Sequence, residues 1–421
     1  MNILKNKLMA ALIAAASLVA FASCDGEKAD EGWENIPLDL ISSASGKATF
    51  YVNDIKSEGS AAVVPQDGKT AKLSMMELIP GYSNLNMTVT LSRDDDTHWS
   101  FSGKTRLAEP PSIAATVRSE MFYGIYDLTV SGKISSEGEI EINAATEVTD
   151  MASGGLAGSW NIVRKCKIIG GKGPLHLTWK AGNLGLDAVC TLVNTAGAVA
   201  VADKLDQITF CQNGNITVRC YESDEDVDFK DLLALRPGID GDSFTFNASH
   251  TEWEETPAAN LAFWYAANGL LYVVPNISAL NEDESGSSSS DFDPSDILGG
   301  LAALAGYGVD LKALNEVLSE IMTKGLAFGY SLENNALSLY LDKGMCDRFV
   351  TPLLPLLPLF DQIMEELAKS EDPEVLQKLA TIKAVFGLLG IEKPSDLGTL
   401  WNNTTEFRIE LNFQKAQFSN P

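Results

Sequence analysis

The segment Leu85–Ser92 constrains the fold of this chain most strongly. Its sequence, LNMTVTLS, alternates apolar side chains with Asn, Thr and Ser. Successive side chains of a β-strand point to opposite faces, so this period of two predicts a strand with one buried face and one hydrated face. Strands of this kind are typical of antiparallel sheets. Between residues 45 and 150 no stretch has helical periodicity over ten residues, and we therefore predict an all-β N-terminal region.

Further strands are expected on both sides of this segment. A partner strand follows it and carries Trp99 and Phe101 on one face. The other predicted strands cover residues 48–52, 60–64, 71–76, 122–130 and 139–146. We expect them to form a β-sandwich-like domain or a half-barrel over residues 41–152. The Gly-rich stretch 150–158 (DMASGGLAG) predicts a domain boundary.

The C-terminal region, residues 156–421, has about ten predicted strands in meander order. Its most informative segment is a hairpin over residues 261–274 that turns at Asn-Gly. The turn predicts that Phe263 and Tyr265 share a face with Tyr272, whereas Trp264 lies on the other face. Both faces are apolar and must be covered, so we expect a core on one side and helices on the other.

Helical segments are predicted as two insertions into this domain, at about 296–323 and 352–400. Asp310 and Asp372 are the expected N-caps, and Gly325 and Gly390 the expected ends. The run 351–360 (TPLLPLLPLF) has a proline at every third residue, which predicts polyproline II. Three alternatives remain for it: an apolar lip over a ligand cavity, a surface for a partner, or a buried connection.

The stretch Gly158-Ser159-Trp160 resembles the opening signature of lipocalin-like (calycin) barrels, in which the tryptophan closes one end. The resemblance implies barrel closure by Trp160. The expected fold class is α+β and mainly antiparallel β, with the N-terminal domain followed by a lipocalin-like barrel with inserted helix pairs. A two-domain lipid-binding tube similar to the bactericidal/permeability-increasing proteins is an alternative for the fold.

The first forty residues predict a location. Lys5 and Lys7 precede an uncharged apolar run, which predicts a signal peptide over residues 1–23. The cysteine after it resembles that of a bacterial lipobox, which implies a lipid on Cys24. Residues 24–40 form an acidic tether that resembles the export signal of Bacteroidetes surface lipoproteins. The whole layout resembles uncharacterised lipoproteins of that group, which implies an outer-membrane lipoprotein exposed at the cell surface.

Composition narrows the choice of partners. With 31 basic and 57 acidic residues the net charge is −26, which argues against nucleic acid and against a bare anionic membrane. Membrane attachment is therefore expected through the lipid on Cys24 alone. A two-residue turn at Asn213-Gly214 would place Cys211 opposite Ile216 and about 13 Å from Cys220 along the strands. We accordingly expect free thiols.

Catalytic motifs are absent from the sequence. It contains no Gly-x-Ser-x-Gly elbow, no His-Glu-x-x-His and no phosphate loop. His98, His176 and His250 have no metal-ligand partner at a fixed spacing. The acidic run 222–228 departs from a calcium loop, because Phe229 stands where that loop needs glycine. We expect no enzymatic activity, no cofactor and no metal.

Two functional hypotheses follow. The first is a non-catalytic lipoprotein that binds a lipid or another apolar or amphipathic small ligand in its C-terminal β-domain. The candidate ligand-binding residues are Phe263, Trp264, Tyr265, Tyr272, Leu353, Leu356 and Phe360. The alternative is an interaction module for an outer-membrane protein or a glycan, with solidly packed domains. A cavity of a few hundred Å³ beside the hairpin would favour the first hypothesis.

Overall fold

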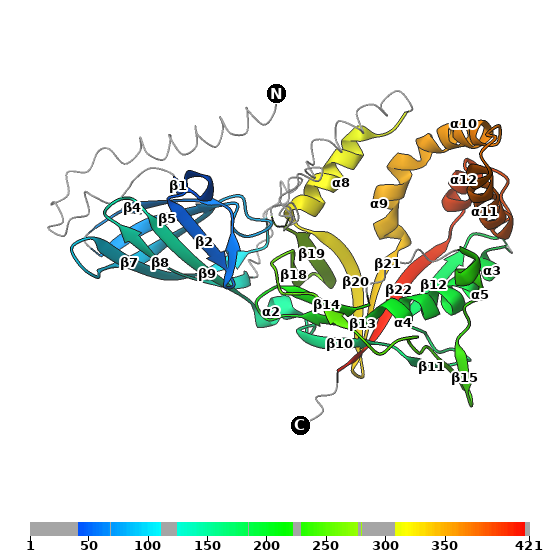
Figure 1. The fold of residues 1–421 in the computed structure, drawn as a ribbon, viewed down its shortest axis with the longest axis horizontal. Helices are drawn as coiled ribbons and strands as arrows, with labels where there is room; N and C mark the ends of the chain where they lie inside the picture. The colour runs from blue at the N-terminus through cyan, green and yellow to red at the C-terminus, as the bar shows by residue number, and fades with distance from the viewer. Residues whose placement is uncertain are drawn as a thin grey trace.

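The computed structural model describes residues 41–67, 69–110, 124–183, 185–221, 229–276, 279 and 308–416. The predicted signal peptide, Cys24 and the tether lie outside these ranges. The acidic run 222–228 and the first part of the first predicted helical insertion, residues 296–307, also lie outside them. The described chain is mainly antiparallel β with added helices, and its two large sheets are both curled (Figure 1).

The N-terminal sheet has nine strands in the order β1-β4-β5-β6-β7-β8-β9-β2-β3. β2 pairs with β9 in parallel, and the other neighbours are antiparallel. Along β6, alternate residues from Leu85 to Leu91 are buried, as the alternation predicted. The single curled sheet fits the half-barrel alternative. The strands are β1 Ile41–Ser42, β2 Ala48–Val52, β3 Ile55–Ser57, β4 Ser60–Pro65, β5 Thr70–Met76, β6 Leu85–Arg93, β7 His98–Ala108, β8 Gly124–Ser135 and β9 Ile140–Val148.

The C-terminal sheet has ten strands in the order β17-β14-β13-β10-β22-β21-β20-β19-β18, and β12 also pairs with β22. A small sheet, β11-β16-β15, lies beside it. The strands are β10 Gly158–Ile162, β11 Lys165–Lys167, β12 Leu175–Lys180, β13 Leu205–Phe210, β14 Ile216–Cys220, β15 Gly238–Asp240, β16 Ser243–Thr245, β17 Glu254–Glu255, β18 Ala262–Ala267, β19 Leu270–Pro275, β20 Leu326–Glu333, β21 Ala336–Asp342 and β22 Glu406–Lys415.

Most of the helices lie in the connections between successive strands of the C-terminal sheet. Asp310 caps α8 as predicted, because its carboxylate accepts from the Ala313 N–H at 3.0 Å. Gly325 follows the end of that helix at φ 99°. The helices are α2 Asp150–Ser153, α3 Gly185–Leu192, α4 Ala198–Lys204, α5 Phe229–Ala234, α8 Leu311–Thr323, α9 Lys343–Leu353, α10 Leu357–Leu367, α11 Pro373–Leu389 and α12 Asp396–Asn402, with a π-helical turn η3 Val193–Gly197 and a 3₁₀ turn η5 Leu354–Leu356.

The polyproline II prediction for residues 351–360 is wrong, because this run is helical throughout. It ends α9, forms η5 and begins α10. Pro355 and Pro358 each lie in the first turn of a new helical segment, where no backbone N–H is needed for the helix. The prolines therefore divide the helix into short pieces. The run is also only partly buried, since Leu356 is buried whereas Leu353 and Phe360 are exposed.

The predicted residue pairing is correct for one of the two Asn-Gly hairpins and wrong for the other. For β18–β19 the predicted pairs are confirmed, including Tyr265 with Tyr272. For β13–β14 the predicted register is wrong, because Phe210 pairs with Ile216. The Cys211 N–H donates to Asn215 O at 2.9 Å, and Gly214 adopts φ 88°, so the loop has three residues instead of two. The described cysteines are free thiols, as expected.

The two sheets meet in one continuous apolar core. Tyr126 on β8 contacts both Phe263 and Tyr265 on β18, with ring centroids 6.3 and 6.4 Å apart. The amide Nδ2 of Asn260 donates to Val52 O at 2.6 Å across the same junction. The Gly-rich stretch after β9 forms α2 and a turn, and Thr149 caps that helix. The chain thus changes sheet at the predicted boundary while its core runs on from one sheet into the other.

Candidate ligand-binding site

Three of the predicted ligand-binding residues face the N-terminal sheet. Phe263 and Tyr265 pack on Tyr126, and Tyr265 also stacks on Tyr272 with centroids 4.9 Å apart. The Tyr265 hydroxyl donates to Lys324 O at 3.0 Å, which ties the strand to the end of α8. These side chains are buried and fill the junction between the sheets. Their contacts give them a packing role there.

Trp264 lies on the opposite face of β18 and packs against Phe210, with ring centroids 5.1 Å apart. Its indole N–H donates to Cys211 O at 2.9 Å. Because neighbouring side chains of a strand point to opposite faces, Trp264 and Tyr265 cannot line one cavity together. The hairpin residues of the predicted site are therefore divided between two faces.

Trp160 lies on β10, between β13 and β22. Its indole N–H donates to Leu156 O at 2.7 Å, and Lys415 Nζ lies 4.5 Å from the ring centroid. The ring is buried in the same core cluster as Trp264. Trp160 is thus placed where the first and last long strands of the C-terminal sheet pair, and its role in closure stays a prediction.

The buried tyrosines of the junction are neutral phenols. Burial raises the pKa of Tyr126, Tyr265 and Tyr272, since the charged phenolate loses its hydration. The neighbouring Glu109 raises the pKa of Tyr265 and Tyr272 further. Groups held neutral in this way serve as hydrogen-bond donors and packing surfaces, and they are unsuited to proton transfer near neutral pH.

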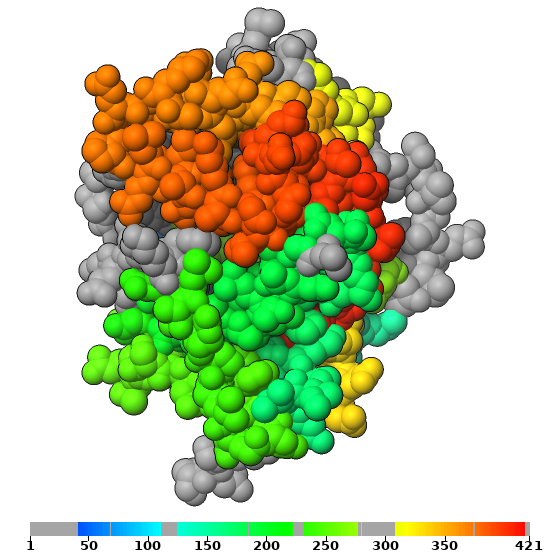
Figure 2. Space-filling view, turned by 90° about the vertical axis from the view of Figure 1, so that its right-hand side faces the viewer, coloured from blue at the N-terminus to red at the C-terminus, as the bar shows by residue number. Residues whose placement is uncertain are grey.

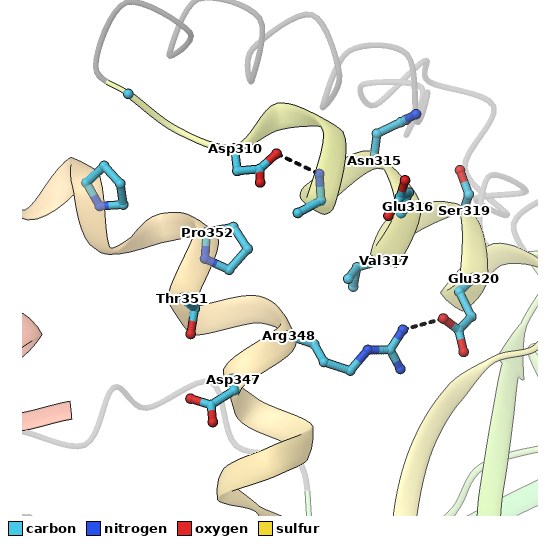
Figure 3. A pocket seen from close by; sticks show the side chains of 13 residues that line it. Asp310, Asn315, Glu316, Val317, Ser319, Glu320, Asp347, Arg348, Thr351 and Pro352 are labelled. Carbon is cyan, nitrogen blue, oxygen red and sulfur yellow. Dashed lines mark hydrogen bonds and ion pairs between the residues drawn. The ribbon is translucent and has the colours of Figure 1, made fainter. Parts of the chain in front are cut away.

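A groove of about 720 Å³ lies elsewhere, between α8 and the helical run α9–η5 (Figure 3). We call it the α8–α9 groove. None of the hairpin residues and none of Leu353, Leu356 and Phe360 is among the described residues that line it. Those lining residues are Gly308, Asp310, Ala313, Asn315, Glu316, Val317, Ser319, Glu320, Asp347, Arg348, Thr351, Pro352 and Pro355.

Local structure explains both walls of the groove. The Asp310 cap fixes the start of α8, and one turn later Ala313 and Val317 present an apolar strip at i, i+4 spacing. On the other wall, Pro352 and Pro355 present rigid apolar rings. Leu356 packs behind them with Val309 and Leu314, so it supports the groove without lining it.

The polar residues of the groove are mostly acidic. Arg348 on α9 forms an ion pair with Glu320 on α8, which joins the two walls (Figure 3). Asp347 accepts from Lys343 Nζ and from the Trp401 indole N–H, both at 2.8 Å. Partial burial raises the pKa of Asp347, but these donors outweigh that effect and hold it below its ordinary value. Four carboxylates and one guanidinium line the groove in all.

Metal ligands do not gather in the described part of the chain. Across those residues, no three of His, Cys, Asp and Glu lie close enough to hold an ion. The histidines belong to separate places: His98 contacts Asp95, His176 pairs across β12–β22, and His250 stacks on Tyr221 at 3.7 Å. The α8–α9 groove is therefore the site that we carry forward.

Sequence reasoning missed the groove although it found its parts. The Asp310 cap and the proline run were both noted, yet nothing local indicates that they face each other across the β20–β21 hairpin. Comparison of the chain with protein-family models, with curated proteins and with solved structures gave no match.

Proposed function

We propose that this protein is a non-catalytic lipoprotein that binds an amphipathic small molecule in the α8–α9 groove. The observation that carries the proposal is the groove itself. Its volume of about 720 Å³ falls within the range of roughly 300–1,000 Å³ that small-molecule sites occupy. Its walls combine apolar surface from Val317 and Pro352 with polar groups at fixed positions, such as the Arg348–Glu320 pair.

The charge of the groove narrows the ligand class. Four carboxylates line it against a single guanidinium. Glu320 is paired with that guanidinium and Asp347 with Lys343, so Asp310 and Glu316 are the remaining charges of the lining. An anionic head group would meet like charges, whereas a neutral or cationic head group would meet partners. The ligand best suited to this lining has an alkyl or ring portion for the apolar walls and a neutral or cationic polar end.

We also propose that the C-terminal domain is a lipocalin-like barrel. In favour of this, β10, β13 and β14 are neighbours in chain order, as are β18 to β22, and β22 pairs with β10. An isolated bridge between Asn215 and Phe263 brings β18 back to the start of β14. The Trp264 N–H donates to Gly214 O at 2.9 Å beside that bridge. In this arrangement α8 and α9 stand at one rim.

Attachment to the outer membrane through a lipid on Cys24 completes the proposal. The sequence motif at Cys24 and the acidic stretch that follows it are its support. A diacylated anchor holds a soluble body near a membrane without further protein contact, because each buried CH₂ contributes roughly 0.8 kcal/mol. The groove would then sample small molecules at the cell surface.

The test is direct binding measured by calorimetry. The full chain is titrated with decyltrimethylammonium and, separately, with decanoate, both below their micellar concentrations. We expect saturable binding of the cation and much weaker binding of the anion. Ala313→Trp fills the groove and should abolish binding, whereas Lys312→Trp adds the same ring at a neighbouring side chain that is 88% exposed and should not. Equal binding by both variants, or no binding by the wild type, would refute the proposal.

A further inference from the structure

A second, smaller pocket adjoins the α8–α9 groove on the side toward β20. Its volume is about 30 Å³, and it shares Val317, Glu320 and Arg348 with the groove. We call it the inner pocket. Its other described lining residues are all apolar: Ile321, Gly325, Leu326, Ala327, Met345 and Phe349. The two spaces therefore meet at the Arg348–Glu320 ion pair, and the walls beyond that pair are apolar.

The ion pair is weak enough to open. The side chains of Arg348 and Glu320 are 47% and 33% exposed. An ion pair of this exposure contributes little to stability, because water screens the two charges. Arg348 reaches Glu320 across the space between α8 and α9 (Figure 3). Rotation of the long Arg348 side chain thus opens a passage from the groove into the inner pocket.

The helices that carry the ion pair are held in place. The Trp401 indole N–H of α12 donates to Asp347 of α9 at 2.8 Å. Figure 2 shows the helical residues 357–402 (orange to red) covering the upper part of the face that they form. On the opposite wall, the Asp310 cap fixes the start of α8. The backbone of both walls is therefore supported, and the Arg348 side chain is the part that can move.

We propose that the inner pocket receives the end of the ligand's alkyl chain, and that Ala327 and Met345 set the longest chain that fits. This inference rests on the proposed function of the α8–α9 groove. The carboxylates that remain for a cationic head group, Asp310 and Glu316, lie toward the start of α8, whereas the inner pocket is reached at Ile321. Eleven residues at about 1.5 Å rise separate Asp310 from Ile321, which is roughly 16 Å along the helix axis. A medium-length alkyl chain spans that distance.

The packed aromatic hairpin closes the far end of the inner pocket. Ala327 pairs with Tyr272 in the β19–β20 register. Burial chiefly raises the pKa of the Tyr272 hydroxyl, and the charges of Glu320 and Arg348 also act on it, in opposite directions. Tyr272 thus lies within electrostatic range of the ion pair. Because Tyr272 is buried and stacks on Tyr265, the space behind Ala327 is filled, and an alkyl chain must end in the inner pocket.

Calorimetry with a series of alkyltrimethylammonium ions, from hexyl to tetradecyl and below their micellar concentrations, tests the inference on the full chain. Wild-type affinity should rise about fourfold for each added methylene, up to the length that fills the inner pocket. In Ala327→Leu, which fills that pocket, the rise should stop at a shorter chain. Binding of the longer ions should then fall on the order of tenfold, while that of the hexyl ion stays the same. Ala336→Leu makes the same change at an exposed position of β21 and should keep the wild-type profile.

Met345→Ala supplies a second readout, because it enlarges the inner pocket instead of filling it. The rise in affinity should then continue to a longer chain than in the wild type. Thermal unfolding of each variant checks that it is folded. If the wild type binds no member of the series, the proposed function fails and this inference with it. If the wild type binds, and Ala327→Leu and Met345→Ala both keep its dependence on chain length, this inference alone is overturned.

Discussion

The Tyr126 hydroxyl of the N-terminal sheet donates to the backbone carbonyl of Trp264 in the C-terminal sheet at 3.0 Å, in a fully buried position. The same two sheets share one apolar cluster. Loss of a buried hydrogen bond of this kind lowers the free energy of unfolding, because the Trp264 carbonyl would lose its donor and no water could replace it. Because of this hydrogen bond and the shared cluster, we expect the stability of each sheet to depend on the other.

Tyr126→Phe tests that dependence. The substitution keeps the ring contacts and removes only the donor, so we expect a loss of about 1–3 kcal/mol in the free energy of unfolding. Because the core is continuous, wild type and variant should both unfold in one cooperative transition followed by denaturant titration. Two separate transitions in the wild type would show that the junction does not couple the sheets.

Leu356 and Leu353 form a matched pair for the support of the α8–α9 groove. Leu356 is 8% exposed and packs with Val309 and Leu314, whereas Leu353 is 37% exposed. Leu356→Ala should cost about 2–3 kcal/mol of stability, near the low end for buried leucines because α9–η5 can partly collapse. Leu353→Ala should cost less than about 1 kcal/mol.

Ligand binding distinguishes this pair further. We expect Leu356→Ala to weaken binding of decyltrimethylammonium in calorimetry, since the wall formed by Pro355 loses its backing. Leu353→Ala should bind as the wild type does. Equal affinity of both variants would mean that the groove does not depend on the cluster of Val309, Leu314 and Leu356.

Partly buried thiols give a chemical prediction. Burial raises the pKa of Cys166, Cys190, Cys211 and Cys346, so each remains protonated at neutral pH. The thiolate is the reactive form, and alkylation by iodoacetamide at pH 7 should be slower than that of glutathione. Mass spectrometry of peptides should show full labelling of the four sites only after denaturation. Rapid labelling of any one of them in the native protein would contradict this.

The sequence predicted strands well where the pattern depends only on residues that are adjacent in sequence. The alternation from Leu85 to Leu91 and the Asn268-Gly269 turn both depend on residues adjacent in sequence, and β6 and the β18–β19 register followed. One additional loop residue was enough to shift the register of β13–β14, because Asn-Gly also suits a three-residue loop with glycine at positive φ.

The candidate site was much harder to predict. Leucine-rich runs with proline at every third residue match polyproline II in isolation, yet tertiary packing of Leu356 holds this run in short helices. The aromatic hairpin was correctly expected to be covered on both faces. What covers Phe263 and Tyr265 is a residue of another sheet, Tyr126, and no local pattern could indicate that.

Asp347 makes stability depend on pH in a definite direction. Its carboxylate lies partly buried, which raises its pKa, but donors from Lys343 and Trp401 hold the pKa below the ordinary 3.8. A carboxyl whose folded pKa is depressed contributes stability above its unfolded pKa, and this contribution is lost as the pH falls through the folded value. Asp347→Asn should therefore destabilise the protein at pH 7 by a modest amount, since the side chain is 39% exposed and partly screened.

The difference between wild type and Asp347→Asn should shrink as the pH falls below 3.8 and vanish once Asp347 is protonated in both folded and unfolded chains. Denaturant unfolding at a series of pH values measures this difference directly. Asp310→Asn is the matched control on the opposite wall, because asparagine caps a helix about as well as aspartate. A gap for Asp347→Asn that stays constant or widens as the pH falls would show that the ion pair with Lys343 does not stabilise the folded chain.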